Sequence, residues 1–149
     1  MSPQYIAGLV DGEGYLAIMP CKNKKNCINP SFQCVFKLTL AGYAAQEVVQ
    51  EIADKYKGWV YKRNKPTATG KDVYTVEIKS KPRLRAFLAD IEPYLIVKKE
   101  QAKILSEFIA LPNIHPNYGN FTPELLALKS ELPKRLKSLT QRIPLAQTE

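Results

Sequence analysis

Near its N-terminus the chain reads Tyr5-Ile6-Ala7-Gly8-Leu9-Val10-Asp11-Gly12-Glu13-Gly14 and continues Tyr15-Leu16-Ala17-Ile18. The first part has the pattern of a short helix that ends at an acidic residue, and the second part is typical of a strand. Gly8 and Gly12 share one helix face with Ala7 and Asp11. Each glycine costs a helix about 1 kcal/mol relative to alanine, so we expect a second backbone to pack closely on this face. Such packing makes Glu13, at the helix end, a candidate metal ligand.

The segment Ile6–Gly14 closely resembles the motif of the LAGLIDADG homing endonucleases, DNA-cutting enzymes encoded within introns and inteins. The family motif ends in Asp or Glu, and Glu13 stands at that position. A similar order of elements continues to about Asn113, over most of the chain. The simpler alternative is an ordinary amphipathic helix that contains glycine, because short motifs also match by chance.

Length and composition predict one domain over residues 1–149, with a core at about 3–113 and a helical extension at about 121–143. The hydrophobic content of 45% and charged content of 24% are globular values. No apolar run reaches membrane-spanning length and no signal peptide is apparent, so we expect no membrane partner. Three irregularly spaced cysteines favour an intracellular protein with free thiols, without distinguishing an organelle from a prokaryotic cytoplasm.

The net charge of +8 is concentrated in two parts of the chain. Residues 20–43 and 57–85 together hold thirteen Lys or Arg and two acids, a balance of +11, and the remaining residues hold nine and twelve, a balance of −3. A basic surface attracts the phosphates of nucleic acid. A solvated lysine surface is the alternative interpretation. The concentration of the positive charge on the predicted strands argues against this alternative.

Hydrophobic periodicity predicts an α+β fold. We expect strands at Gly14–Met19, Ser31–Leu40, Trp59–Lys65 and Asp72–Lys79, and helices at Tyr43–Tyr56, Lys81–Ile91 and Val97–Ala110, followed by a final helix capped by Thr122 and broken or kinked near Pro133. This αββαββα order permits an antiparallel four-stranded sheet with helices on one face, plus C-terminal helices, which is the fold that the resemblance implies.

The uncovered face of such a sheet fits the major groove of DNA, where Arg reads guanine and Gln reads adenine. Strand alternation and the basic loop after the first strand together supply the predicted DNA-binding residues, which are Lys22, Asn23, Lys24, Lys25, Gln33, Val35, Lys37, Tyr61, Arg63, Lys65, Asp72 and Tyr74.

Hydrolysis of a phosphodiester needs an activated water and neutralised phosphate charge, which carboxylate-bound Mg²⁺ supplies. The single histidine, His115, lies in a predicted loop, and no Ser–His–Asp arrangement can be built around it. Since the sequence holds only one copy of the motif, one Glu13 does not complete a site for paired metals.

The resemblance supplies the rest of the expected site. Relatives with one motif are homodimers whose motif helices pack about a two-fold axis, which implies an interface of Ala7, Gly8, Asp11 and Gly12. The implied metal ligands are the Glu13 carboxylate and the Gly12 carbonyl, with Mg²⁺ as cofactor and Mn²⁺ or Ca²⁺ as other occupants. The segment Pro93–Ala102 resembles the family segment that brings a basic residue into the active site, and Lys98 takes that position as a second catalytic residue.

Two positions depart from the family pattern. Leu40 stands where relatives often carry a Gln that positions the water, and Ala44 stands near an expected basic residue. Either the alignment with the family is shifted at these positions, or Lys37 or Thr39 takes over the missing role, or cleavage is weakened.

The sequence therefore predicts a homodimeric, Mg²⁺-dependent, intron-encoded homing endonuclease. It would make a staggered double-strand break in a long, nearly palindromic DNA target, with one acid from each subunit at the dimer axis. Three alternatives are an RNA-splicing maturase, a catalytically silent DNA-binding protein on the same scaffold, and an unrelated basic module. The last would be a monomer, because its own chain would fill the Gly8 and Gly12 face.

Overall fold

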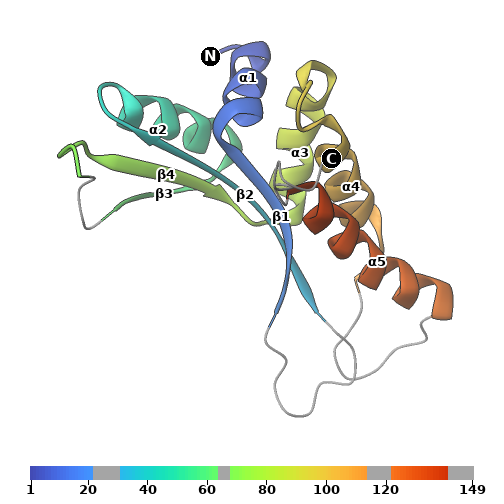
Figure 1. The fold of residues 1–149 in the computed structure, drawn as a ribbon. Coiled ribbons are helices and arrows are strands. Elements are labelled where there is room, and N and C mark those ends of the chain that lie inside the picture. The colour runs from blue at the N-terminus through green and yellow to red at the C-terminus, as the bar shows by residue number, and fades with distance from the viewer. Residues whose placement is uncertain (22–30, 64–67, 114–121, 141–149) are drawn as a thin grey trace, which may run out of the picture.

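The computed structural model describes residues 1–21, 31–63, 68–113 and 122–140, and the predicted α+β class is confirmed (Figure 1). The elements in chain order are α1 (Pro3–Glu13), β1 (Gly14–Pro20), β2 (Phe32–Ala41), α2 (Ala45–Tyr56), β3 (Trp59–Lys62), β4 (Val73–Ile78), α3 (Lys81–Ile91), the 3₁₀ helix η1 (Glu92–Tyr94), α4 (Lys99–Ala110) and α5 (Pro123–Thr140). None of the helices in these ranges is long and apolar enough to cross a bilayer.

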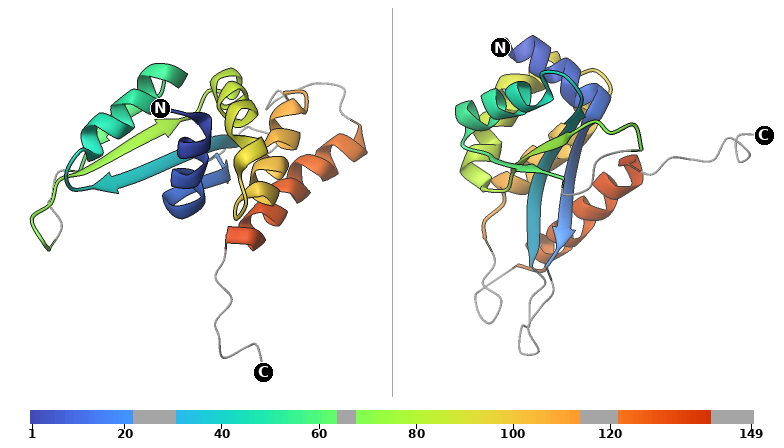
Figure 2. Two further views of the ribbon diagram at one scale, coloured as in Figure 1. Left: turned by 90° about the horizontal axis from the view of Figure 1, so that it is seen from above. Right: turned by 90° about the vertical axis from the view of Figure 1, so that its left-hand side faces the viewer.

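All strand pairs in the sheet are antiparallel, in the order β1-β2-β4-β3. The helices gather on the upper and right-hand side of the curved sheet in Figure 1, and Figure 2 shows this arrangement from two further directions. None of the helices that the structure describes covers the opposite face of the sheet in these views. Because α1 leads directly into β1, the end of the motif helix is fixed to the sheet.

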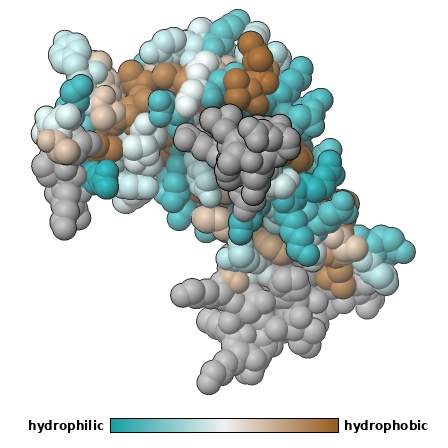
Figure 3. Space-filling view, viewed as in Figure 1, coloured by the Kyte–Doolittle hydropathy of each residue, from teal (hydrophilic) through white to brown (hydrophobic). Residues whose placement is uncertain are grey.

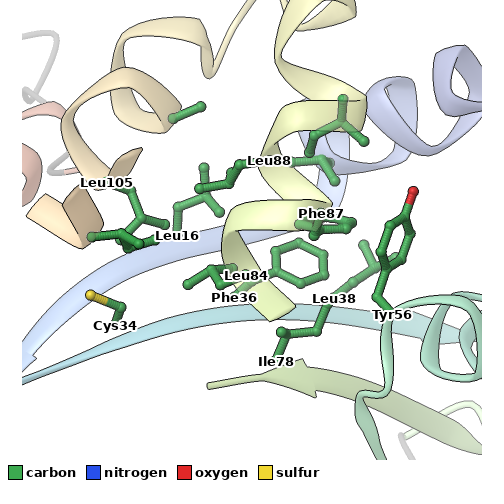
Figure 4. Packing of buried hydrophobic residues seen from close by; sticks show 14 of the residues in the cluster. Leu16, Cys34, Phe36, Leu38, Tyr56, Ile78, Leu84, Phe87, Leu88 and Leu105 are labelled. Carbon is green, nitrogen blue, oxygen red and sulfur yellow. The ribbon is translucent and has the colours of Figure 1, made fainter. Parts of the chain in front are cut away.

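The core lies between the sheet and the helices, where alternate strand residues point (Figure 4). Phe36 of β2 packs on Phe87 of α3 with ring centroids 4.3 Å apart, and Tyr56 of α2 meets Phe87 edge-on at 5.0 Å. Leu132 and Leu136 of α5 are buried in the same cluster. Because one set of alternate strand side chains is buried in this core, the other set forms the open face of the sheet.

Two residues predicted to contact DNA are not exposed on the open face of the sheet. Val35 is on the open face but is fully buried, in the strand that lies between β1 and β4. Tyr74 pairs with Leu40 and packs against the core on the helix-covered face. The alternation in β4 was correct, but the sequence did not show which of its two faces the helices would cover.

The ends of several elements also differ from the prediction. Strand β3 stops at Lys62, and α5 continues through Pro133 without a break. A proline inside a helix costs about 3 kcal/mol, and the buried Leu132 and Leu136 on either side offset that cost. The predicted cap of α5 is confirmed, since the backbone N–H of Leu125 donates to the Thr122 hydroxyl at 3.2 Å.

Candidate nucleic-acid interface and catalytic centre

The motif helix α1 ends at an exposed acid. Ser2 caps its first turn, accepting a hydrogen bond from the backbone N–H of Tyr5, and Gly14 closes its last turn by donating to the Val10 carbonyl. A Cβ at Gly14 would lie 2.7 Å from that oxygen, so only glycine fits where the helix becomes a strand. Glu13 has no hydrogen bond or ion pair within the described part of the chain. Its carboxylate is therefore available to a ligand.

The glycine face of α1 is open. A Cβ built at Gly8 or Gly12 meets no atom of the described chain within 4 Å, and both residues are exposed. The predicted role of Ala7 on this face is wrong, because Ala7 is fully buried in the core of its own chain. Its position next to Gly8 in sequence turns it to the inner side of the helix.

Asp11 ties the motif helix to the start of α4. One of its carboxylate oxygens accepts the backbone N–H of Ile96 at 2.9 Å, and the other accepts that of Lys98, also at 2.9 Å. The Lys98 ammonium donates to the Asp11 carbonyl at 2.8 Å, close to the negative end of the α1 dipole. These three bonds hold Lys98 against the last turn of α1, where Glu13 lies.

Apolar side chains border this helix end. Ile96 is 85% exposed and Val97 is 72% exposed, and Tyr94 beside them is also exposed. Figure 3 shows apolar colour at the top of the molecule, where α1 meets the segment before α4. Sequence reasoning missed this patch, although the run Tyr94-Leu95-Ile96-Val97 was a signal. Exposed apolar residues grouped in this way are typical of an interface.

The open face of the sheet carries some of the predicted residues. Gln33 and Tyr61 are exposed there, and Lys37 is half-buried with its ammonium 3.9 Å from the Glu77 carboxylate. Trp59 is 72% exposed on the same face and was missed. Its alternation with Tyr61 in β3 could have identified it.

Solved structures share this arrangement. A structure of the homing endonuclease I-CvuI with I-CreI target DNA, in the presence of Mg and with the DNA not cleaved, has a TM-score of 0.74 and 19% identity over 95% of this chain and 83% of that chain. The homing endonuclease I-TnaI has a TM-score of 0.67 and 19% identity over 93% and 95%. The I-SmaMI LAGLIDADG homing endonuclease bound to cleaved DNA has a TM-score of 0.71 and 14% identity over 94% and 45%. The chain has the LAGLIDADG homing endonuclease fold. No protein-family model and no curated protein matches the sequence.

Other predicted DNA contacts of this LAGLIDADG fold lie at its margins. Arg63 is exposed just beyond β3, with its backbone N–H bonded to the Val73 carbonyl at 2.9 Å. Asp72 forms an ion pair with Lys62 at 3.3 Å. The remaining predicted contacts lie outside the described residues, and these are Lys22, Asn23, Lys24, Lys25 and Lys65.

Within the described residues, one chain offers only part of a metal-binding site. The described residues contain no group of three or more His, Cys, Asp or Glu that could hold a metal ion. Glu13 and the carbonyl of Gly12 are oxygen donors, which Mg²⁺ prefers, but they form only part of a coordination shell. The oxygen donors therefore fit Mg²⁺. They are too few to complete its coordination shell, so further donors would have to come from outside this chain.

Proposed function

We propose that this chain is a homodimeric, metal-dependent homing endonuclease that makes a staggered double-strand break in a long, nearly palindromic DNA target. The observation that carries the proposal is the free Glu13 carboxylate at the end of α1, in the helix turn whose Asp11 carbonyl binds Lys98, next to an open glycine face. The proteins of similar fold are described as homing endonucleases, several of them in complexes with DNA.

The dimer rests on surface that the chain leaves uncovered. Two copies of α1 can approach closely at Gly8 and Gly12, because no side chain of the described chain occupies that space. Ile96 and Val97 would extend the contact with apolar area. A two-fold axis makes such a surface self-complementary and brings together one Glu13 from each copy. An unrelated monomeric module is not supported, since the glycine face is not filled from within the described chain.

Glu13 and the Gly12 carbonyl of each copy would hold Mg²⁺. The ion supplies charge neutralisation at the phosphate and lowers the pKa of bound water. Lys98 contributes a fixed positive charge, since its ammonium is anchored to the Asp11 carbonyl and loses little freedom when DNA binds. Asp11 acts through Lys98 and positions it.

Duplex DNA would lie against the open face of the sheet. Gln33 and Tyr61 are exposed there for contacts with bases, and the net charge of +8 provides sequence-independent attraction. The basic segment of Lys22, Lys24 and Lys25 joins the two strands nearest the motif, and we expect it to contact the DNA backbone.

A catalytically silent DNA-binding protein is the second candidate. Leu40 packs against the core on the helix-covered side, so it provides no polar group at the position where the family pattern has Gln. Ala44, at a positive φ of 61°, likewise provides no basic side chain before α2. Such a protein would bind its target and leave it intact.

Cleavage of a duplex pool with randomised half-sites tests both candidates. The pool is incubated with Mg²⁺, and cut and bound molecules are sequenced separately for the wild type and for Glu13→Gln. We expect nearly palindromic cut sites with the wild type and bound but intact DNA with the variant. Bound sites that the wild type never cuts would support the silent protein. Absence of duplex binding would reject both candidates and direct the same assay to folded intron RNA.

A further inference from the structure

A second basic site lies at the edge of the sheet, where α2 turns into β3. A cavity of about 480 Å³ opens there, and the side chains that line it include Lys57, Trp59, Tyr61, Glu77, Lys79 and Arg83. Trp59 and Tyr61 belong to the open face of the sheet, whereas Arg83 comes from α3. The cavity therefore joins the proposed DNA-binding face to the helical layer.

The charge in this cavity is positive and partly preorganised. Lys57, Lys79 and Arg83 supply three positive charges and Glu77 supplies one negative charge, a balance of +2. The Glu77 carboxylate lies 2.7 Å from the Lys79 ammonium, which compensates it. Arg83 donates through Nη1 to the Lys57 carbonyl at 3.0 Å, which fixes the guanidinium and leaves its other N–H groups available.

Lys57 occupies a backbone conformation that favours glycine. It has a φ of 59° and ends α2, a position at which glycine is usual and lysine is strained. The neighbouring Gly58 cannot take a side chain, since a Cβ there would lie 3.0 Å from Val76 and 3.1 Å from the Glu77 carbonyl. Despite this strain Lys57 lies at the cavity, so the turn between α2 and β3 adds a lysine to its lining.

The uncommitted nitrogen groups of the cavity are hydrogen-bond donors, and the hydroxyls of Tyr61 and Ser80 in its lining can donate as well. The ammonium of Lys57 makes no ion pair within the described residues, and the indole N–H of Trp59 can only donate. Trp59 is also 72% exposed, which leaves a large apolar ring in water beside these cations. Donors and positive charge match a ligand whose polar atoms are all acceptors and carry negative charge.

We propose that this cavity binds a backbone phosphate of the duplex that lies on the open face. Lys57 and Arg83 neutralise the phosphate, Trp59 donates its indole N–H, and its ring covers the adjoining sugar. The site rests on the proposed DNA-binding function and adds to it an anchor that fixes position without reading sequence.

The test is the salt dependence of DNA binding, measured by fluorescence anisotropy on a selected target duplex and on a duplex of unrelated sequence. The variants are Lys57→Gly, Arg83→Gln, their combination, and Trp59→Phe, which retains an aromatic ring, though a smaller one, and removes the N–H. Lys134→Gln, on the exposed surface of α5, is the matched control for loss of one charge. The plot of log K against log salt has a negative slope. We expect the combined variant to reduce the magnitude of this slope by about 0.9, the value for one phosphate contact.

The Lys57→Gly variant also separates binding from folding. Relief of the positive φ should raise its Tm by a few degrees, while its affinity for both duplexes falls by the same factor. Slopes and affinities equal to those of Lys134→Gln would overturn the phosphate anchor. A loss confined to the selected target would also overturn it, because the cavity would then read bases. Failure of the wild type to bind either duplex would instead reject the proposed function, together with the anchor that depends on it.

Discussion

At the scale of single residues, Asp11 has a role within its own chain that its position in the motif did not indicate. The motif predicted a contact between subunits, and the structure adds that the carboxylate accepts two backbone N–H groups from the segment before α4. Those groups belong to Ile96 and Lys98, more than eighty residues away in the chain. A short-range sequence pattern cannot reveal such a pairing.

Replacement of Asp11 by Ala should destabilise the fold by about 1–2 kcal/mol, because two N–H groups at the start of α4 lose their acceptor. The free energy of unfolding in urea measures the loss. Asp11→Asn retains one good acceptor and should lose less. Equal stability of Asp11→Ala and the wild type would show that water replaces the carboxylate without cost.

Cys34 should make stability depend on alkaline pH. Burial raises the pKa of its thiol from 9.0 to about 11, although Lys81 and Lys129 nearby lower it. Because the folded pKa is the higher one, this contribution is complete below pH 9 and is lost as the pH rises towards 11. We expect the wild type to lose about 2–3 kcal/mol more than Cys34→Ala over this interval. Parallel pH profiles of unfolding free energy for the two proteins would contradict this.

At the scale of elements, the sequence predicted the helices and strands well, because their hydrophobic periods are clear. It was less successful with the faces of β4. Val73 and Tyr74 are both apolar, so alternation left two choices, and Tyr74 turned out to pack towards the core. The strand ends also depended on packing, as with β3, which stops at Lys62.

At the junction of α1 and β1, Gly12 and Gly14 should respond differently to alanine. Gly14→Ala should destabilise the chain by more than about 1 kcal/mol, since its Cβ would overlap the Val10 backbone at 2.7–2.8 Å. Gly12→Ala meets open space and should stabilise the separate chain by up to about 1 kcal/mol through helix propensity. Unfolding at low protein concentration measures both. A Gly14→Ala chain as stable as the wild type would mean that the helix–strand junction can relax.

At the scale of the whole molecule, the exposed apolar patch and the glycine face together should determine the oligomeric state. We expect Ile96→Glu to convert a dimer into a monomer in sedimentation velocity, because it places a charge in the proposed interface. Leu139→Glu, at an exposed position on α5, is the control and should remain dimeric. A monomeric wild type would contradict the proposed interface, and dimerisation of both variants would place the interface elsewhere.

The sequence by itself determined the order of elements, the motif helix ending at Glu13, and the location of the positive charge, because periodicity, glycine spacing and charge are local properties of a chain. The tertiary structure decided that Ala7 and Val35 are buried, that Asp11 anchors Lys98, and that Lys57, Trp59 and Arg83 line one cavity. Each of these depends on residues far apart in sequence, whose contacts follow from how the helices and strands pack against one another and not from the pattern within any one of them.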